Sequence, residues 1–390
     1  MHIDLNAFFA SAEEIRDPSL KGKPILIGHE GRSGIVSTAS YAARKAGCHS
    51  GQPMFQALRL CPGAKVIAPD FSYYKVLSVS FFSYLKEYSP IIEQASIDEA
   101  YVDMSKPLGK CADPIGYLRS MQFRLKKLTG LSCSIGIAPT KWLAKMGSDL
   151  HKPMGLTIIR RKDIQRLILP LPIEKFWGIG KKTCPELKAI GIKTIGDLRD
   201  RLVQEDQDAM RILGKFAFTA LSWVSGRGDD KVQVEADDPK SIGNSTTLPI
   251  DCCGYDEVAK AVSDLCDEVS GRAKAQHKAG FTITLTVKDT AFRLHTRAAT
   301  LKEPTDDAKA IKSKAEELYK RNFEAMDVRL VGVTLSKLVD PLKRTVQMTI
   351  FNYEYYEQAD KTRMLINQMN RKMKKPLLMR GSEAKKDGED

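Results

Sequence analysis

The chain has 390 residues, and its 61 Lys and Arg against 48 Asp and Glu give a formal net charge of +13 at pH 7. Apolar residues make up 43% and charged residues 28%, a globular composition that excludes a wholly disordered or collagen-like chain. At about 150 residues per domain, we expect two to four domains. No apolar run approaches the roughly 18 residues that a membrane helix needs, and the N-terminus lacks the pattern of a signal peptide. The positive charge favours a polyanionic partner without identifying one.

Cysteine usage points to reduced thiols. The chain has eight cysteines, none of them in a CxxC pair and most of them in apolar sequence. We therefore expect core cysteines rather than disulfides or a zinc site. This usage also favours a cytoplasmic protein, and the lack of a long apolar run predicts no membrane partner.

The first 160 residues alternate between strand and helix patterns. In chain order they predict a strand over 1–6, a helix over 8–16, a strand over 91–97 with its return over 101–104, a helix over 115–128, a strand over 133–137 and a helix over 140–150. The last helix should end before Pro153, because the residue preceding a proline is pushed out of the helical conformation. This order is typical of a ferredoxin-like sheet built from split βαβ units.

The rest of the chain divides into three regions and a tail. Residues 161–228 have helical spacing throughout, and residues 229–241 are polar without periodicity, as expected of a linker. Residues 242–340 predict a small α+β domain, with strands over 281–288 and 329–336 and helices over 256–278 and 306–321. Residues 341–390 form the tail. We therefore predict a multidomain α+β protein.

Three carboxylates lie where predicted strands end. Asp4 follows the first strand, and Asp98 and Glu99 follow the strand that begins at residue 91. Adjacent residues of a regular strand point to opposite faces, so the chain must turn here if Asp98 and Glu99 are to share a site. Three hard oxygen ligands suit Mg²⁺, and a pair of such ions supports phosphoryl transfer. On the spacing alone, solvated turn carboxylates are the favoured explanation.

Four stretches together resemble the motifs of Y-family translesion DNA polymerases of the bacterial DNA polymerase IV type. They are residues 2–11 (HIDLNAFFAS), 37–45 (STASYAARK), 96–103 (SIDEAYVD) and 141–153 (KWLAKMGSDLHKP), and they occur in the family's order and spacing. The likeness covers roughly residues 1–340. One departure is Asn6, where the family often has Asp.

The resemblance implies a right-hand polymerase fold. Residues 1–6 and 69–160 would form the catalytic palm, which is ferredoxin-like, and residues 7–68 the small fingers. Residues 161–228 would form a helix-hairpin-helix thumb, residues 229–241 the linker, and residues 242–340 the α+β little-finger domain.

The resemblance also implies roles in the active site. Asp4, Asp98 and Glu99, together with the Leu5 carbonyl, would hold two Mg²⁺ ions. Phe9 matches the steric gate, a ring under the sugar that leaves no room for a 2′-hydroxyl. By themselves, Phe9 and its neighbour Phe8 could equally be core residues.

Further positions match contacts to the nucleotide, a deoxynucleoside triphosphate (dNTP). They are Phe8, Phe9, Thr38, Tyr41, Arg44 and Lys152. Arg offers a planar fork of donors and Lys a point charge, and both suit phosphate oxygens. Outside the resemblance, Arg44 and Lys152 would be interpreted as solvated surface charges.

Two regions predict contacts with primer–template DNA. Gly178, Gly180 and Lys181 look like the hairpin of a helix-hairpin-helix, in which glycines let backbone N–H groups approach a phosphate. In the last domain, acidic residues crowd the helix over 256–278, while Lys288, Arg293 and Arg297 lie on or between strands. We therefore expect a basic sheet that faces DNA and an acidic helical layer that faces water, although the acidic helix could simply keep the domain soluble.

Residues 347–351 (QMTIF) resemble the short peptide by which bacterial polymerases bind the β subunit of the sliding clamp. Gln347 would supply hydrogen bonds, and Ile350 and Phe351 would enter an apolar pocket. An apolar strand end is the alternative explanation of this pentapeptide.

Together, these features predict a monomeric, low-fidelity DNA polymerase that transfers nucleotides from dNTPs to a primer 3′-hydroxyl by two-metal catalysis. The sequence offers no second acidic cluster suited to a 3′→5′ exonuclease, so we expect no proofreading. The alternatives are another two-metal nucleotidyl enzyme such as a nucleotide cyclase, and a DNA-binding protein without catalysis. A cyclase needs no helix-hairpin-helix, and the three carboxylates argue against a non-catalytic protein.

Overall fold

The computed structural model describes residues 1–235, 237–341, 365 and 369. It divides into two compact units, Met1–Asp237 and Asp238–Asp390, and each is described by itself. The predicted clamp-binding residues 347–351 lie outside the described residues. Within the described part of the chain, no helix is long and apolar enough to cross a membrane.

The first unit is organised around a five-stranded sheet in the order β5–β6–β1–β7–β8. The strands are β1 (His2–Leu5), β5 (Ile92–Gln94), β6 (Glu99–Val102), β7 (Cys133–Ile137) and β8 (Leu156–Ile158). β1 is antiparallel to both β6 and β7, so the first strand of the chain lies at the centre. This order confirms the ferredoxin-like prediction. β8, which the sequence did not predict, adds a strand parallel to β7.

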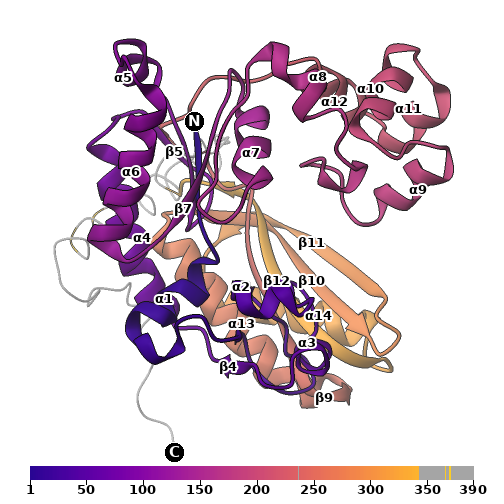
Figure 1. Ribbon diagram of the computed structural model, residues 1–390. Helices are drawn as coiled ribbons and strands as arrows, with labels where there is room; N and C mark the ends of the chain where they lie inside the picture. Colours follow the sequence, from indigo (N-terminus) through magenta and orange to yellow (C-terminus); the bar gives the residue numbers. More distant parts are fainter. Residues whose placement is uncertain (236, 342–364, 366–368, 370–390) are drawn as a thin grey trace, which may run out of the picture. The chain divides into compact units, whose positions relative to one another are not determined.

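Helices cover the two faces of this sheet differently (Figure 1). α4 (Phe71–Lys86) and α6 (Pro114–Thr129) pack on one face, and α7 (Lys141–Leu150) packs on the other, while α5 (Ser105–Gly109) precedes α6. Side chains alternate along β1, so Ile3 and Leu5 enter the core with α4 and α6. His2 and Asp4 point to the opposite face and contact α7. The polar face of β1 is therefore the face covered by α7.

One strand boundary differs from the prediction. β6 spans Glu99–Val102, so Glu99 begins a strand and does not end one, and the turn lies before it, over residues 95–98. The backbone N–H groups of Ala95 and Ser96 both donate to the Glu99 carbonyl, which closes this turn. The expected turn between the two strands is present, but it lies over residues 95–98 instead of 98–100, so it contains Asp98 and precedes Glu99.

A small three-stranded sheet follows the first helix. α1 spans Phe8–Arg16, as predicted, and the 3-10 helix η1 spans Pro18–Leu20. The sheet has the order β3–β2–β4, with β2 at Ile25–Ile27, β3 at Thr38–Ala39 and β4 at Lys65–Ile67. α2 (Tyr41–Lys45) and α3 (Met54–Leu60) complete this part. The Ser40 hydroxyl caps α2 by accepting from the backbone N–H of Ala43. This cap fixes the start of the helix that carries Tyr41 and Arg44.

The predicted all-helical region is confirmed. Its helices are η2 (Arg161–Asp163), α8 (Ile164–Leu167), η3 (Ile173–Lys175), α9 (Thr183–Ala189), α10 (Ile195–Val203), α11 (Gln207–Leu213) and α12 (Phe216–Val224). They share one apolar core with Trp142, Leu143 and Met146 of α7. α7 therefore packs on the five-stranded sheet and on the helical region at once.

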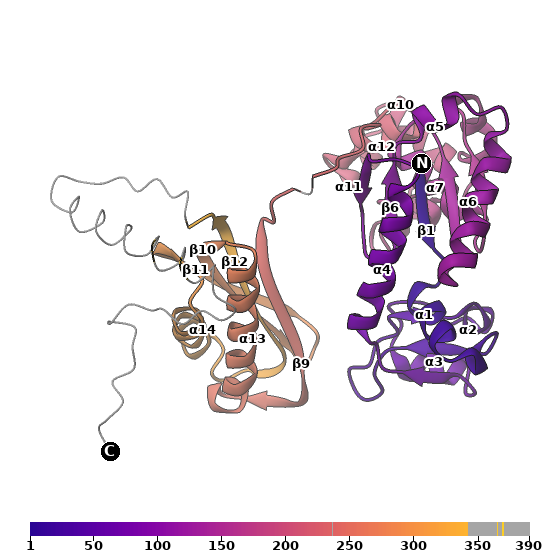
Figure 2. The same cartoon turned by 90° about the vertical axis from the view of Figure 1, so that its left-hand side faces the viewer.

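The second unit is a four-stranded antiparallel sheet in the order β11–β10–β12–β9, with two helices on one face (Figure 2). Its elements are β9 (Ser241–Cys253), α13 (Tyr255–Ala275), β10 (Ala279–Asp289), β11 (Leu294–Thr305), α14 (Ala308–Asn322) and β12 (Asp327–Val339). The predicted strands and helices are confirmed, but β9 and β11 were not predicted as strands. Ile283, Leu285 and Val287 of β10 point to the helices and are fully buried.

Candidate active site

The pairing of β1 with β6 brings two of the three predicted carboxylates together. Asp4 lies directly opposite Glu99 in the antiparallel register. Side chains of such a pair lie on the same face of the sheet. Asp98 lies in the turn before β6, where its carbonyl accepts from the backbone N–H of Leu5 at 3.0 Å. The Ser96 hydroxyl donates to the Asp98 carboxylate at 2.7 Å. The turn therefore places Asp98 beside the end of β1.

Two lysines that follow Asp4 far along the chain hold its carboxylate. Lys145 Nζ lies 3.0 Å from Asp4 Oδ2 and 2.6 Å from Glu99 Oε1. Lys152 Nζ lies 2.7 Å from Asp4 Oδ1 and 2.8 Å from Asp149. Both oxygens of Asp4 are thus paired with ammonium groups, and the Asp4 side chain is only 6% exposed.

Burial and charge separate the pKa values of this pair of carboxyls. Burial alone would raise the pKa of Asp4, but its hydrogen bond with Glu99 and the charges of Lys145 and Lys152 hold that pKa well below its usual value. Burial, then the hydrogen bond with Asp4, raises the pKa of Glu99 to about 7. Two close carboxyls that share a proton behave in this way. Burial also raises the pKa of Asp98.

The donor chemistry of this cluster suits a divalent cation. In the described ranges, no three His, Cys, Asp or Glu side chains are gathered as a ready-made metal cluster. Asp4 and Glu99 nevertheless hold a cation between them, because both contact the same ammonium nitrogen of Lys145. Carboxylate and carbonyl oxygens are the ligands that Mg²⁺ prefers. The types of ligand present here therefore fit a metal site formed by Asp4, Asp98, Glu99 and the Leu5 carbonyl.

The aromatic residues after β1 have different environments. Ala7 adopts a left-handed conformation, with φ 45°, and this lets α1 begin with only two residues between it and the end of β1. Phe8 then points into the apolar core and is 2% exposed, so its side chain is a packing residue and we assign it no contact with a nucleotide. Phe9 is half-buried and stacks on Tyr74, with ring centroids 4.5 Å apart.

Apart from Lys152, the predicted phosphate-contacting residues lie on α2 and just before it. The Arg44 guanidinium is 5.2 Å from the centre of the Tyr41 ring, and its Nε donates to the Ala39 carbonyl. The Tyr41 hydroxyl is buried and has no hydrogen-bond partner among the described residues. Burial raises the pKa of Tyr41, and the nearby charges of Arg44 and Lys152 oppose that effect. Thr38 is half-buried on β3.

The two predicted hairpin glycines differ in what the fold demands of them. Gly178 has a φ of 112°, and a Cβ there would lie 3.0 Å from the Phe216 ring, so the fold itself requires glycine. Gly180 has an ordinary φ, and a Cβ there would meet no atom within 4 Å. Since nothing in the described structure requires a glycine at 180, the open space beside it fits the approach of a partner. Lys181, next in the chain, is exposed.

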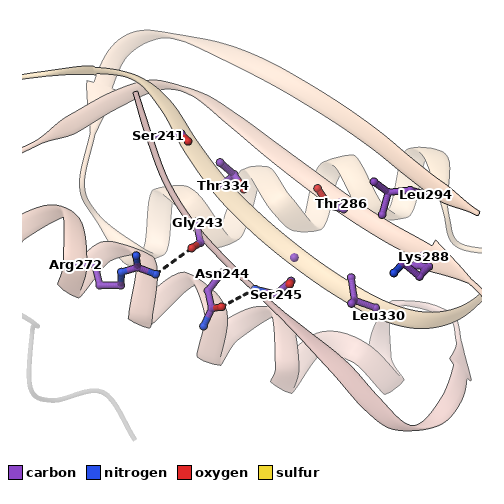
Figure 3. Close-up of a pocket in the computed structure, with 11 residues that line it drawn as sticks. Ser241, Gly243, Asn244, Ser245, Arg272, Thr286, Lys288, Leu294, Leu330 and Thr334 are labelled. Carbon is purple, nitrogen blue, oxygen red and sulfur yellow. Dashed lines mark hydrogen bonds between the residues drawn. The ribbon is translucent and has the colours of Figure 1, made fainter. Parts of the chain in front are cut away.

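The open face of the second unit's sheet is less basic than predicted (Figure 3). Thr286 and Lys288 of β10 lie there, opposite Gly332 and Leu330 of β12, and they line a shallow hollow of about 540 Å³. Most of the other lining residues are small or carry hydroxyl groups, among them Ser241, Gly243, Ser245 and Thr334. Its two charged residues are Lys288 and Arg272 of α13, and of these only Lys288 belongs to the predicted set.

Arg297 requires a correction. It pairs with Leu285, whose side chain points to the helices, so Arg297 lies on that side of β11. Its Nε donates to Asn322 of α14, and its guanidinium lies over the Phe323 ring. Arg297 therefore does not share the open face with Lys288. Arg293 lies in the turn between β10 and β11, where its backbone N–H donates to Asp289. The predicted acidic residues of α13, such as Asp264 and Glu268, are exposed.

Sequence reasoning missed the residues of α7 that complete the cluster. Besides Lys145, they are Ser148, whose hydroxyl lies 2.8 Å from His2 Nδ1, and Asp149, which pairs with both lysines. Residues 145, 148, 149 and 152 recur at intervals of three and four, which places them on one side of the chain where it is helical. That spacing within residues 141–153 is the signal that could have identified them.

Comparisons with known proteins agree along the chain. Residues 3–149 match the model of the impB/mucB/samB family, residues 239–350 match that family's C-terminal domain, and residues 161–192 match the IMS family HHH motif. The chain is 36% identical over 373 residues to DNA polymerase IV of Oceanobacillus iheyensis, an alignment that covers 95% of this chain and 88% of that protein. It is 34% identical over 390 residues to DNA polymerase IV 1 of Bacillus subtilis, covering 99% and 93% of the two chains.

Solved structures give a similar result. A Y-family DNA polymerase chimera of Dbh and Dpo4 is 27% identical with a TM-score of 0.76, and the match covers 87% of this chain and 98% of the chimera. DinB from Sulfolobus solfataricus is 28% identical with a TM-score of 0.58, at the same coverage. An insertion ternary complex of Dbh DNA polymerase matches with a TM-score of 0.60 at 27% identity, again with coverage of 87% and 98%.

Proposed function

This chain belongs to the impB/mucB/samB family of Y-family polymerases and is a template-directed DNA polymerase of the translesion class, and from that premise we propose which of its residues carry the reaction. The observation that carries the proposal is the placement of Asp4 opposite Glu99, with a cation held between them. The primer 3′-hydroxyl would attack the α-phosphate of a dNTP beside these two carboxylates, the bond between the α- and β-phosphates would break, and pyrophosphate would leave.

We assign the metal-binding role to Asp4, Asp98, Glu99 and the Leu5 carbonyl, and the metal to Mg²⁺, two ions per site. When bound, such ions activate the attacking hydroxyl and neutralise charge that develops on the phosphate. The protein's part is to fix the oxygens: β-sheet pairing aligns Asp4 with Glu99, and the Ser96 hydroxyl orients Asp98. Carboxylates held in this way need little reorganisation during the reaction.

The nucleotide would lie against α1 and α2. Tyr41, Arg44 and Lys152 would bind the triphosphate, and Thr38 would support them with a hydroxyl. The buried, unpaired hydroxyl of Tyr41 supports this assignment, because a buried donor without a partner is costly unless a ligand supplies one. Phe9 would act as the steric gate, and its stacking on Tyr74 would keep the ring in one orientation.

Primer–template DNA would be held through its backbone. We propose residues 161–228 as the thumb, with Gly178, Gly180 and Lys181 at its phosphate contact, residues 1–6 and 69–160 as the palm, and residues 7–68 as the fingers. We propose residues 229–241 as the linker and residues 242–340 as the little finger, whose open sheet face would lie along the duplex. Small residues such as Ser, Thr and Gly suit that role because they let a sugar–phosphate backbone approach closely. Lys288 would add a charged contact to a phosphate.

Primer extension by the purified protein tests the active-site assignment. With Mg²⁺, dNTPs and a primed template, the parent should add nucleotides, and Asp98→Ala and Glu99→Ala should lose at least 100-fold in rate, as expected when a charge-stabilising group is removed. Asp103→Ala, in the same motif, serves as the matched control and should retain activity. A Glu99→Ala variant that extends primers as well as the parent would remove Glu99 from the metal site.

We also propose that residues 347–351 bind the sliding clamp, that the polymerase acts as a monomer, and that it works in the cytoplasm. Replacing Ile350 and Phe351 by Ala should abolish binding to the purified clamp while leaving distributive primer extension unchanged. Gln358→Ala, outside the pentapeptide, is the control. Clamp binding that survives the double replacement would show that another segment makes the contact.

A further inference from the structure

Lys145 has an unusual position for a lysine, because it is almost fully enclosed at the catalytic carboxylates. Its side chain is 8% exposed, and its ammonium lies 3.0 Å from Asp4, 2.6 Å from Glu99 and 3.4 Å from Asp149. Lysine is seldom buried unless it is paired, and here three carboxylates pair with it. Lys152, which also contacts Asp4, is more exposed, at 23%.

The position of Lys145 is fixed by the fold. α7 packs its apolar residues Trp142, Leu143 and Met146 into the core of the helical region, and this leaves the side that bears Lys145 against β1. The neighbouring Ser148 hydroxyl donates to the backbone carbonyl of Lys145. The Ser148 Oγ atom also lies 2.8 Å from His2 Nδ1 of β1. Lys145 is therefore anchored, and it is not a surface side chain that happens to reach the site.

We propose that Lys145 is an internal counter-ion that occupies the place between Asp4 and Glu99 in the free enzyme and so keeps its affinity for divalent cations low. This inference rests on the proposed metal-binding role of Asp4 and Glu99. Lys145 is here a positioning residue: its ammonium offsets the negative charge of the two carboxyl groups and must yield its contacts before they can hold a metal.

A consequence concerns the order of binding. Asp4 is neutralised by Lys145 through one oxygen and by Lys152 through the other. A triphosphate that draws Lys152 away frees one oxygen of Asp4 and adds negative charge to the site. Metal binding should therefore be weak without nucleotide and strong with it, because nucleotide removes one of the two competing cations.

The test is the binding of Mn²⁺ to the full chain without DNA or nucleotide, measured by calorimetry and by the electron paramagnetic resonance of free Mn²⁺. Lys145→Met removes the charge and keeps the length of the side chain, and we expect it to bind Mn²⁺ at least tenfold more tightly than the parent. Lys145→Arg keeps the charge and should bind as weakly as the parent. Lys141→Met is the matched control, because Lys141 lies on the same helix in ion pairs with Glu93 and Asp229, and it should leave Mn²⁺ affinity unchanged.

Further outcomes separate the inference from the proposed function. If Lys145→Met folds poorly, Lys145→Gln replaces it, and thermal unfolding in a chelator identifies which variant is intact. Equal or weaker Mn²⁺ binding by a folded, uncharged variant overturns the inference, even where Asp4→Asn abolishes primer extension. Full primer extension by Asp4→Asn would instead overturn the metal-site assignment. Tighter Mn²⁺ binding that Asp4→Asn removes from the Lys145→Met background supports both.

Discussion

At the scale of single residues, Phe9 is held in place by its neighbours. Its ring stacks on Tyr74, and the edge of Phe71 packs against it with centroids 5.8 Å apart. A ring restrained in this way can exclude a hydroxyl group by its shape, since it has few alternative positions. We therefore predict that Phe9→Ala raises the ratio of ribonucleotide to deoxynucleotide incorporation by roughly 10- to 200-fold, the range expected for steric discrimination of one small group.

The measurement for Phe9 is single-nucleotide insertion, comparing kcat/KM for a ribonucleotide and the matching deoxynucleotide. Phe123→Ala is the control, because Phe123 is an exposed phenylalanine of α6 and should leave the ratio unchanged. If the ratio is the same in Phe9→Ala and in the parent, Phe9 is a packing residue and not the gate.

Glu99 should make the stability of the metal-free protein depend on pH. Burial and the hydrogen bond with Asp4 raise its pKa to about 7 in the folded state, above the usual value of 4.5. The folded state therefore binds this proton more tightly than the unfolded state does. The contribution of Glu99 to stability must therefore fall as the pH rises from about 4.5 to about 7 and level off above that. The effect of Asp4, whose pKa is lowered, is confined to more acidic conditions.

Thermal unfolding in a chelator between pH 5 and pH 8 measures this dependence. Glu99→Gln removes the titrating group, so the melting temperature of the parent should fall relative to that of Glu99→Gln over this range. Identical pH profiles for the parent and Glu99→Gln would mean that Glu99 titrates near its ordinary value.

At the scale of elements, α7 joins the sheet to the helical region through aromatic contacts. Trp142 stacks on Trp223, which in turn stacks on Trp177, and the Trp142 indole donates to the Trp177 carbonyl. The chain has three tryptophans, and all of them belong to this ladder. Its tryptophan fluorescence therefore reports on one junction only.

Trp177 immediately precedes the proposed phosphate contact at Gly178, Gly180 and Lys181, and it is 46% exposed. We predict that primer–template DNA shields this indole and lowers the quenching of tryptophan fluorescence by acrylamide. Trp177→Phe should remove most of the change, because Trp177 is the most exposed of the three tryptophans: Trp142 is buried and Trp223 is half-buried in the free protein. Unchanged quenching on saturation with DNA would place the contact elsewhere.

The local sequence pattern was sufficient to predict elements with strong hydrophobic periodicity. It failed for strands that form only because they pair with a neighbouring strand. β10 alternates apolar and polar residues and was predicted, whereas β9 buries only Ile242, Leu248 and Cys252 along its 13 residues. β11 is an edge strand whose residues are almost all partly or fully exposed. Neither strand has a local sequence signal that distinguishes it from a loop, so its extended conformation depends on the strand with which it pairs.

The same limit explains which site residues could be predicted. The meeting of Asp4 with Glu99 follows from two strands in one sheet, and it was expected. The face on which Arg297 lies depends on its register with Leu285, which no local pattern reveals. Lys145 reaches Asp4 across 141 residues, and that contact exists only because α7 packs on β1. Asn6 is similar: its side chain donates to Ser134 and accepts from the backbone N–H of Met154, which gives this departure from the family pattern a structural role.

At the scale of the whole molecule, the net charge of +13 should be expressed as salt-dependent DNA binding through both units. Each lysine that neutralises a phosphate releases counterions, so the logarithm of the binding constant falls linearly with the logarithm of salt concentration. Lys181 belongs to the first unit and Lys288 to the second. If each contacts one phosphate, each replacement by Ala should reduce the slope by about one.

The double variant carries the stronger test, because it asks whether both units grip one duplex at the same time. Fluorescence anisotropy of a labelled primer–template between 50 and 200 mM salt should give a slope reduced by about two for Lys181→Ala with Lys288→Ala, the sum of the single effects. Lys126→Ala, an exposed lysine of α6, controls for the loss of net charge and should leave the slope unchanged. If the double variant matches Lys181→Ala alone, the duplex is held by the first unit, and the open face of the four-stranded sheet serves another purpose.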